Sequence, residues 1–291
     1  MTTETLTDEK TGRKYTIDYP DDYRLGEAVT LLLSLHGGGS VGAWQRLYFP
    51  AQDVANKYRV VIVTPSCATK EPFRRWVLDA DEEHLVNIIE QTFARFGKQN
   101  IKAFWLVGHS QGGMTSNLLL GTDYFRDRVD GWLSLSGGRL GPIKLPDTFF
   151  PGGRPPNLPA TGPRPGAGTL PDADISFIFT SGEREMVELP ATSPWAEKYG
   201  AGARVRQPDV IDDKPGQVWD TTREGKSTPA WGGRPAPGKA EVWLYPNAQG
   251  GKVIADVVRL EKGHTEGLEP NVTDYLVKLM VEAPGGKMRN L

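Results

Sequence analysis

The segment GHSQG at residues 108–112 matches the pattern G-x-S-x-G. It stands between an apolar run, 101–107, that predicts a buried strand, and a segment, 111–121, that predicts a helix closed by glycine. In this context the pattern predicts a nucleophile elbow, a turn so tight that glycines must flank the exposed serine. Ser110 is therefore the candidate nucleophile, and acyl transfer is the chemistry that the motif indicates.

A serine hydroxyl is a weak nucleophile and needs a general base, which is most often histidine. Along chains with an elbow of this kind, the acid follows the serine and the histidine follows the acid. The chain has four histidines, His36, His84, His109 and His264, and only the last follows Ser110. It comes after the last predicted strand and before the last predicted helix, so His264 is the candidate base.

The acid that orients the histidine is expected shortly after the strand predicted at 175–180. Glu185 lies three residues beyond the glycine that follows this strand and is the preferred candidate. Glu183, which is closer to the strand, is the rival, and Asp172 and Asp174 remain alternatives. Each of these side chains could instead be a solvated loop carboxylate.

The negative oxygen that forms during acyl transfer needs backbone N–H donors aimed at it. One is expected from Gln111, directly after the nucleophile. The other is expected from the loop HGGGS that follows the strand predicted at 29–35, because glycines let the backbone approach a substrate closely. Gly38 is the preferred donor, Gly39 is the next, and His36 is expected to brace the loop.

Several side chains near these segments are candidates for substrate contact. Trp44 follows the glycine-rich loop closely, Trp76 precedes the helix predicted at 79–96, and His109 is adjacent to the nucleophile. Aromatic rings could form an apolar wall for an acyl group; core packing is the alternative for each tryptophan. His84 is expected at the protein surface.

The elements that would position these residues alternate between strands and helices. Short apolar runs that end in glycine or proline are typical of strands buried on both faces of a parallel sheet. Strands are predicted at 13–20, 29–35, 59–64, 101–107, 129–136, 175–180, 241–245 and 253–260, and helices at 50–57, 79–96, 111–121 and 272–283. The alternation predicts an α/β fold with a mostly parallel central sheet flanked by helices.

Two segments rich in glycine and proline interrupt this alternation, at about 141–171 and 200–239. We interpret both as ordered insertions that form a rim or cap over one edge of the sheet, within a single domain spanning 1–291. A disordered linker is the alternative for each segment.

Composition excludes several other classes of protein. The 291 residues carry a formal net charge of −2, which gives no electrostatic reason to expect nucleic acid or an anionic membrane as a partner. The single cysteine excludes an intramolecular disulfide, and the histidines lack metal-binding spacing, so no metal or other cofactor is expected. The sequence has no bilayer-spanning apolar run and no signal-peptide core, which predicts a cytoplasmic protein unless a leader has been removed.

These motifs resemble those of the α/β-hydrolase superfamily. The segments LLLSLHGGGS, IKAFWLVGHSQGGMTSNLLL, SGG at 136–138 and KGH at 262–264 are similar to those of the branch that contains polyhydroxybutyrate depolymerases and feruloyl esterase-like enzymes. The resemblance covers about 13–140, 175–190 and 252–283. The sequence departs from this branch in its two insertions and in having glutamate where aspartate is the usual acid.

Together the motifs and the resemblance imply an α/β-hydrolase fold and a serine hydrolase that cleaves the carboxylic ester of a small or oligomeric substrate. Ser110 would attack, His264 would transfer protons, Glu185 would hold the histidine, and the N–H groups of Gln111 and Gly38 would bind the oxyanion. A serine peptidase or amidase is the alternative on the same fold, followed by a non-hydrolytic binding protein.

Overall fold

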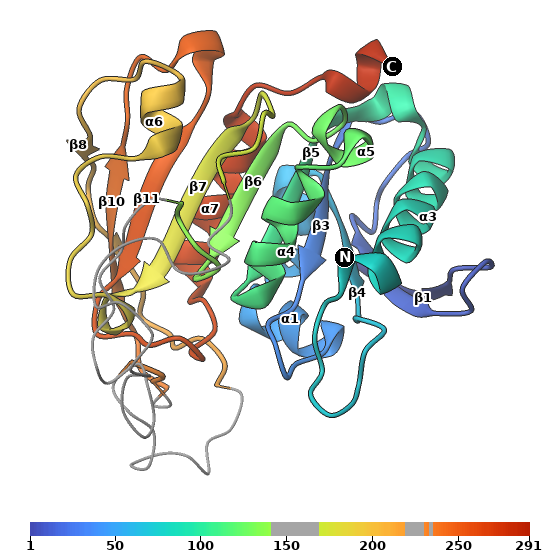
Figure 1. Ribbon diagram of the computed structural model, residues 1–291, viewed down its shortest axis with the longest axis horizontal. Helices are drawn as coiled ribbons and strands as arrows, with labels where there is room; N and C mark the ends of the chain where they lie inside the picture. Colours follow the sequence, from blue (N-terminus) through green and yellow to red (C-terminus); the bar gives the residue numbers. More distant parts are fainter. Residues whose placement is uncertain (141–168, 219–229, 233–234) are drawn as a thin grey trace.

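The computed structural model describes residues 1–140, 169–218, 230–232 and 235–291 (Figure 1). Among these residues, eleven strands form one mixed sheet, and helices cover both of its faces. The predicted α/β-hydrolase fold, with its mostly parallel sheet, is confirmed. The strands follow one another across the sheet in the order β1-β2-β4-β3-β5-β6-β7-β11-β10-β8, and β9 also pairs with β10.

The bounds of the elements agree closely with the apolar runs in the sequence. The strands are β1 (Thr2–Thr7), β2 (Lys14–Tyr19), β3 (Val29–Leu35), β4 (Val60–Pro65), β5 (Ile101–His109), β6 (Gly131–Leu135), β7 (Ser176–Gly182), β8 (Val205–Arg206), β9 (Val210–Ile211), β10 (Lys239–Leu244) and β11 (Ile254–Arg259). The helices are α1 (Gly42–Tyr48), α2 (Ala55–Tyr58), α3 (Leu78–Phe96), α4 (Gln111–Leu119), α5 (Asp123–Arg126), α6 (Pro194–Lys198) and α7 (Pro270–Glu282).

Side chains of the central strands alternate between two buried layers. Leu31 and Leu33 of β3 pack in the layer that contains α3 and α4, whereas Leu32 packs on the other face with α1 and α7. Because both faces are covered, every residue of β3 is buried. This explains why the strand is a continuous apolar run rather than an alternation of apolar and polar residues.

The strands β4, β3, β5, β6, β7 and β11 run parallel, so their carboxyl ends meet at one edge of the sheet, at the bottom of Figure 1. Loops that leave this edge carry Gly38 after β3, Ser110 after β5, Ser136 after β6, Glu185 after β7 and His264 after β11. Parallel sheets of this kind bind their ligands at the carboxyl edge. The topology therefore gathers residues that are far apart in the sequence.

Six of these elements were not predicted from the sequence: β1, α1, α5, α6, β8 and β9. The residues of β1 are alternately exposed and half-buried, so the strand lacks an apolar run. The α1 helix has only seven residues, too few for a clear helical period. In the later insertion, β8 and β9 pair antiparallel with β10 and cover its edge. Most of the earlier insertion, 141–171, lies outside the described residues.

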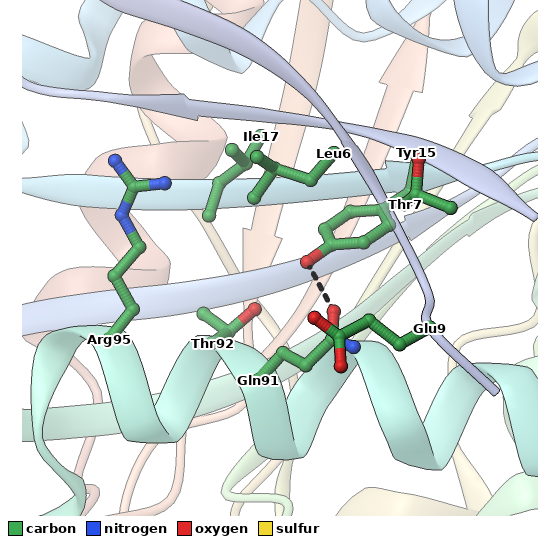
Figure 2. Close-up of a pocket in the computed structure, with 8 residues that line it drawn as sticks. All are labelled: Leu6, Thr7, Glu9, Tyr15, Ile17, Gln91, Thr92 and Arg95. Atoms are coloured by element: carbon green, nitrogen blue, oxygen red, sulfur yellow. Dashed lines mark hydrogen bonds between the residues drawn. The ribbon is translucent and has the colours of Figure 1, made fainter. Parts of the chain in front are cut away.

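A surface cavity of about 290 Å³ lies between the β1–β2 hairpin and α3 (Figure 2). Three of its polar side chains have partners: the Tyr15 hydroxyl donates to Gln91 at 2.9 Å, and Arg95 pairs with Glu4 at 2.6 Å. The cavity lies near the β1 end of the sheet, whereas the candidate nucleophile follows the central strand β5. Among the described helices, none is long and apolar enough to cross a bilayer.

The prediction that His84 lies at the surface is wrong, because this side chain is fully buried in α3. Its Nδ1 lies 2.8 Å from Asp8, in the loop that follows β1. Asp8 also accepts hydrogen bonds from Thr11 and Asn87. Burial alone would raise the pKa of Asp8, but these hydrogen bonds outweigh it and lower the pKa to about 2. The buried cluster ties the amino-terminal hairpin to α3.

Replacement of Asp8 by alanine should lower the free energy of unfolding by about 3 kcal/mol, because several buried donors lose their acceptor at once. The measurement is urea unfolding at neutral pH. Glu9→Ala is the matched control, since the Glu9 side chain is exposed, and it should change the stability by less than about 0.5 kcal/mol. Equal effects of the two substitutions would contradict a stabilising role for the cluster.

Candidate active site

Ser110 lies at the turn between β5 and α4 with φ 51° and ψ −117°. Residues other than glycine rarely adopt a positive φ, and such strain is concentrated at functional sites. The backbone is crowded around the turn: a Cβ on Gly108 would lie 2.3 Å from the carbonyl carbon of Gly112, and one on Gly112 would lie 2.3 Å from the Leu35 carbonyl oxygen. Glycine at these two positions is what allows the turn to close.

His264 lies between Ser110 and Glu185 and contacts both. Its Nε2 lies 2.9 Å from Ser110 Oγ, and its Nδ1 lies 2.6 Å from Glu185 Oε2. When Glu185 is ionised it can only accept, so Nδ1 carries the proton and Nε2 is left to accept from the serine hydroxyl. The structure thus brings together one side chain from each of the loops after β5, β7 and β11.

The other carboxylates that were considered for the acid point elsewhere. Glu183 is exposed and accepts a hydrogen bond from the Glu261 backbone N–H at 2.8 Å. Asp174 pairs with Lys252 at 2.9 Å, and Asp172 is exposed.

Glu185 is buried yet ionised. Burial raises its pKa, but the nearby His264 imidazole and the hydrogen bonds that the carboxylate accepts outweigh this effect, so the pKa lies below its usual value. The Gly182 N–H lies 2.7 Å and the Ser136 hydroxyl 2.8 Å from Oε1. Glu185 therefore remains a carboxylate near neutral pH and can stabilise a positive charge on His264.

The loop that carries His264 is held on two sides. Arg259, at the end of β11, forms a buried ion pair with Glu269 at 2.9 Å and donates to the Glu266 carbonyl at 2.8 Å. On the other side, the His264 N–H donates to the Ala230 carbonyl at 2.9 Å. These contacts fix the position of the imidazole relative to the sheet.

The glycine-rich loop after β3 faces the elbow. The Gly39 N–H donates to the Arg74 carbonyl at 2.7 Å, so this N–H is already engaged, and Gly38 remains the preferred candidate for the oxyanion donor. Gln111 is the first residue of α4, where a backbone N–H has no partner within the helix. The side-chain oxygen of Gln111 accepts a hydrogen bond from the backbone N–H of Trp76 at 3.1 Å. This hydrogen bond links the elbow to the segment before α3.

His36 links the start of this glycine-rich loop to neighbouring segments through hydrogen bonds. Its Nε2 accepts a hydrogen bond from the Cys67 N–H at 3.1 Å, and its carbonyl accepts from the Trp76 indole at 2.7 Å. Burial lowers the pKa of His36 to about 4. The imidazole is therefore neutral at physiological pH, as its role as a hydrogen-bond acceptor requires.

The three side chains that were candidates for substrate contact all lie in the interior, because Trp44, Trp76 and His109 are each less than a tenth exposed. His109 donates from Nε2 to the His264 carbonyl at 3.0 Å, and its ring stacks on Tyr48 with 3.7 Å between centroids. Burial holds the pKa of His109 well below its usual value. His109 therefore supports the loop that carries His264 from the protein interior.

Two further aromatic rings lie near the site. Phe73 is 54% exposed, and its ring lies 3.2 Å from the place that a Cβ on Gly38 would occupy. Trp231 packs edge-on against the His264 ring with 5.0 Å between centroids. Phe73 belongs to an irregular loop, so no periodicity or motif in the sequence distinguishes it.

No group of three or more histidine, cysteine, aspartate or glutamate side chains that could hold a metal ion is found among the described residues.

Acidification should destabilise the protein through His36. The unfolded chain binds a proton at this histidine below about pH 6.5, whereas the folded chain does so only near pH 4. Stability is therefore lost as the pH falls through this interval, by about 2 kcal/mol at pH 5. Urea unfolding at pH 7 and pH 5 should show that His36→Gln loses about 2 kcal/mol less than wild type between the two pH values. Equal losses would show that His36 is not kept neutral.

Residues 32–288 match the model of the alpha/beta hydrolase family. Among solved structures, the chain is similar to acetyl xylan esterase from Aspergillus awamori, with 11% identity and a TM-score of 0.52 over 97% of this chain and 100% of that one. It is also similar to TT1662 from Thermus thermophilus, with 17% identity and a TM-score of 0.49 over 97% and 100% of the two chains. No curated protein sequence matches it. Since the family model spans most of its length, the chain belongs to the alpha/beta hydrolase family.

Proposed function

We propose that the protein is a serine hydrolase that cleaves a carboxylic ester through an acyl-enzyme intermediate. The observation that carries the proposal is the continuous hydrogen-bonded series from Ser110 through His264 to Glu185, with distances of 2.9 Å and 2.6 Å. A nucleophile, a base within reach of it and a carboxylate that orients the base are the parts that acyl transfer requires.

The geometry supports the following sequence of steps. Ser110 Oγ attacks the ester carbonyl while His264 Nε2 takes the serine proton. The imidazolium that forms is stabilised by the ionised Glu185 at Nδ1. His264 then gives the proton to the departing alcohol, and the acyl group remains on Ser110. A water molecule, deprotonated by His264 in the same way, releases the carboxylic acid and restores the serine.

The oxyanion of each tetrahedral intermediate is assigned to the backbone N–H groups of Gln111 and Gly38. Gln111 is the first residue of α4, so its backbone is fixed by the start of the helix. The loop around Gly38 is tied to the segment before α3 by the hydrogen bond from the Gly39 N–H to the Arg74 carbonyl. Donors that are fixed before the reaction stabilise the transition state without reorganising during it.

Apolar rings near the serine suit the acyl group of a substrate, which esters and amides share. Phe73 and Trp231 place apolar rings near the glycine-rich loop and the His264 ring, respectively, and apolar walls suit the acyl or alcohol part of an ester. The structural similarity to an acetyl xylan esterase is in keeping with ester chemistry. Short acetyl esters, hydroxybutyrate oligomers and feruloyl esters are the substrate classes to compare, with matched anilides for the amidase alternative.

Ser110→Ala should abolish the hydrolysis of every ester that the wild-type protein cleaves, with a loss of at least about 10³-fold in kcat. The measurement is turnover of the matched ester and anilide panel. Ser116→Ala is the control. Ser116 is a buried serine on α4, and its hydroxyl donates to the Gly112 carbonyl. This variant should retain activity within about threefold. Faster cleavage of the anilides would favour the amidase, and full activity of Ser110→Ala would refute the proposed nucleophile.

Glu185→Gln should lower kcat by about 10³- to 10⁴-fold, because the amide cannot stabilise the imidazolium and lets the ring adopt the wrong tautomer. Glu183→Gln is the control: it keeps an oxygen that can accept from the Glu261 N–H, so kcat should change by less than about threefold. Steady-state kinetics with the best ester of the panel would distinguish the two carboxylates. The opposite pattern would transfer the role of the acid to Glu183.

A further inference from the structure

Ser136, the first residue after β6, has a backbone conformation that serine rarely adopts. Its φ is 53°, in the left-handed region where a non-glycine residue is strained. Its N–H donates to the Thr180 carbonyl at 2.7 Å, which holds the backbone in place. Glycine would adopt this φ without strain. The presence of serine therefore indicates that its side chain makes an interaction that offsets the strain.

The side chain of Ser136 contacts Glu185. Its Oγ lies 2.8 Å from Oε1, and the Gly182 N–H lies 2.7 Å from the same atom, whereas Oε2 faces His264. An ionised carboxylate only accepts, so the serine hydroxyl must donate. Two donors on Oε1 fix the orientation of the carboxylate and leave Oε2 directed at the imidazole.

Tyr48, at the end of α1, is also buried. Its ring stacks on His109 with 3.7 Å between centroids, and His109 donates from Nε2 to the His264 carbonyl at 3.0 Å. The loop that carries the base is therefore supported from α1 through His109, whereas the acid is held by the loop after β6 through Ser136.

The titratable and charged groups near Glu185 come from three elements. His264 faces it from the loop after β11, Tyr48 faces it from α1, and Arg259 lies at the end of β11. Arg259 is already paired with Glu269 at 2.9 Å. The donors that directly contact the Glu185 carboxylate are therefore His264, the Gly182 N–H and Ser136.

We propose that Ser136 is a positioning residue for the acid of the catalytic triad. Ser136 holds one oxygen of Glu185 so that the other stays aligned with His264 while the proton moves. The inference rests on the proposed serine-hydrolase function. Because Ser136 acts through Glu185, its loss should lower kcat, change the hydrogen bond between Glu185 and His264, and leave KM unchanged.

Loss of the Ser136 hydroxyl removes one of the two donors on Oε1, so the carboxylate is held less firmly in line with His264. The proton between His264 Nδ1 and Glu185 Oε2 gives a downfield proton NMR resonance whose position depends on the geometry of that hydrogen bond. This resonance should therefore move upfield when the Ser136 hydroxyl is removed. A substitution that only loosened the fold elsewhere would lower the Tm and would leave the resonance in place.

The test is the measurement of kcat and KM for p-nitrophenyl acetate at neutral pH, together with the proton NMR resonance of His264 Nδ1. The main variant is Ser136→Gly, which removes the hydroxyl but also relieves the backbone strain, so its Tm should stay close to that of wild type. We expect kcat to fall about tenfold and the Nδ1 resonance to move upfield, with KM within about twofold.

Ser176→Ala is the matched control, because Ser176 is a buried serine at the far end of β7 whose Oγ accepts from the Val253 N–H. It should leave both kcat and the Nδ1 resonance unchanged. A Ser136→Gly protein with wild-type kcat and an unshifted resonance would overturn the inference, as would a rise in KM with an unshifted resonance. Failure of the proposed function itself would be recognised separately, by an inactive wild type or a fully active Ser110→Ala.

Discussion

The buried contact between Glu185 and His264 is the interaction on which the candidate site depends. A carboxylate removed from water is strongly destabilising unless donors surround it. Here the donors come from separate loops: the imidazole of His264 after β11, the Gly182 N–H at the end of β7, and the Ser136 hydroxyl after β6. The ionised form persists because these loops reach one point, and they do so because the parallel sheet brings its carboxyl ends to one edge.

Such convergence requires the backbones to approach one another closely. A Cβ on Gly182 would lie 2.3 Å from the Lys262 carbonyl oxygen, so β7 and the histidine loop can meet only where one of them lacks a side chain. Arg259 and Glu269 form a buried ion pair beneath the same loop. Side chains held in this way need little rearrangement before proton transfer, and this preorganisation is the main physical source of rate acceleration in acyl transfer.

Sequence signals predicted the parts of this arrangement that depend on local pattern. The elbow at Ser110 has a motif, a strand before it and a helix after it, and His264 is the only histidine that follows Ser110. The continuous apolar run of β3 likewise revealed a strand covered on both faces.

Contacts between distant elements could not be predicted in the same way. His84 is buried because the hairpin that contains Asp8 packs on α3, and nothing near position 84 encodes that packing. The contact between Ser136 and Glu185 depends on the place where the loop after β6 meets the loop after β7. The choice of Glu185 over Glu183 rested on spacing alone, whereas the structure separates them by burial and by hydrogen-bond partner.

Covalent labelling offers a test of whether Ser110 is an activated nucleophile. The folded wild-type protein would be incubated with a fluorophosphonate, and the modified residue would be located by mass spectrometry of its peptides. A serine that His264 deprotonates should attack the phosphorus, so one phosphonyl group is expected on the peptide that contains Ser110, with none in Ser110→Ala. An unlabelled wild-type protein, or a label on another residue, would contradict the mechanism.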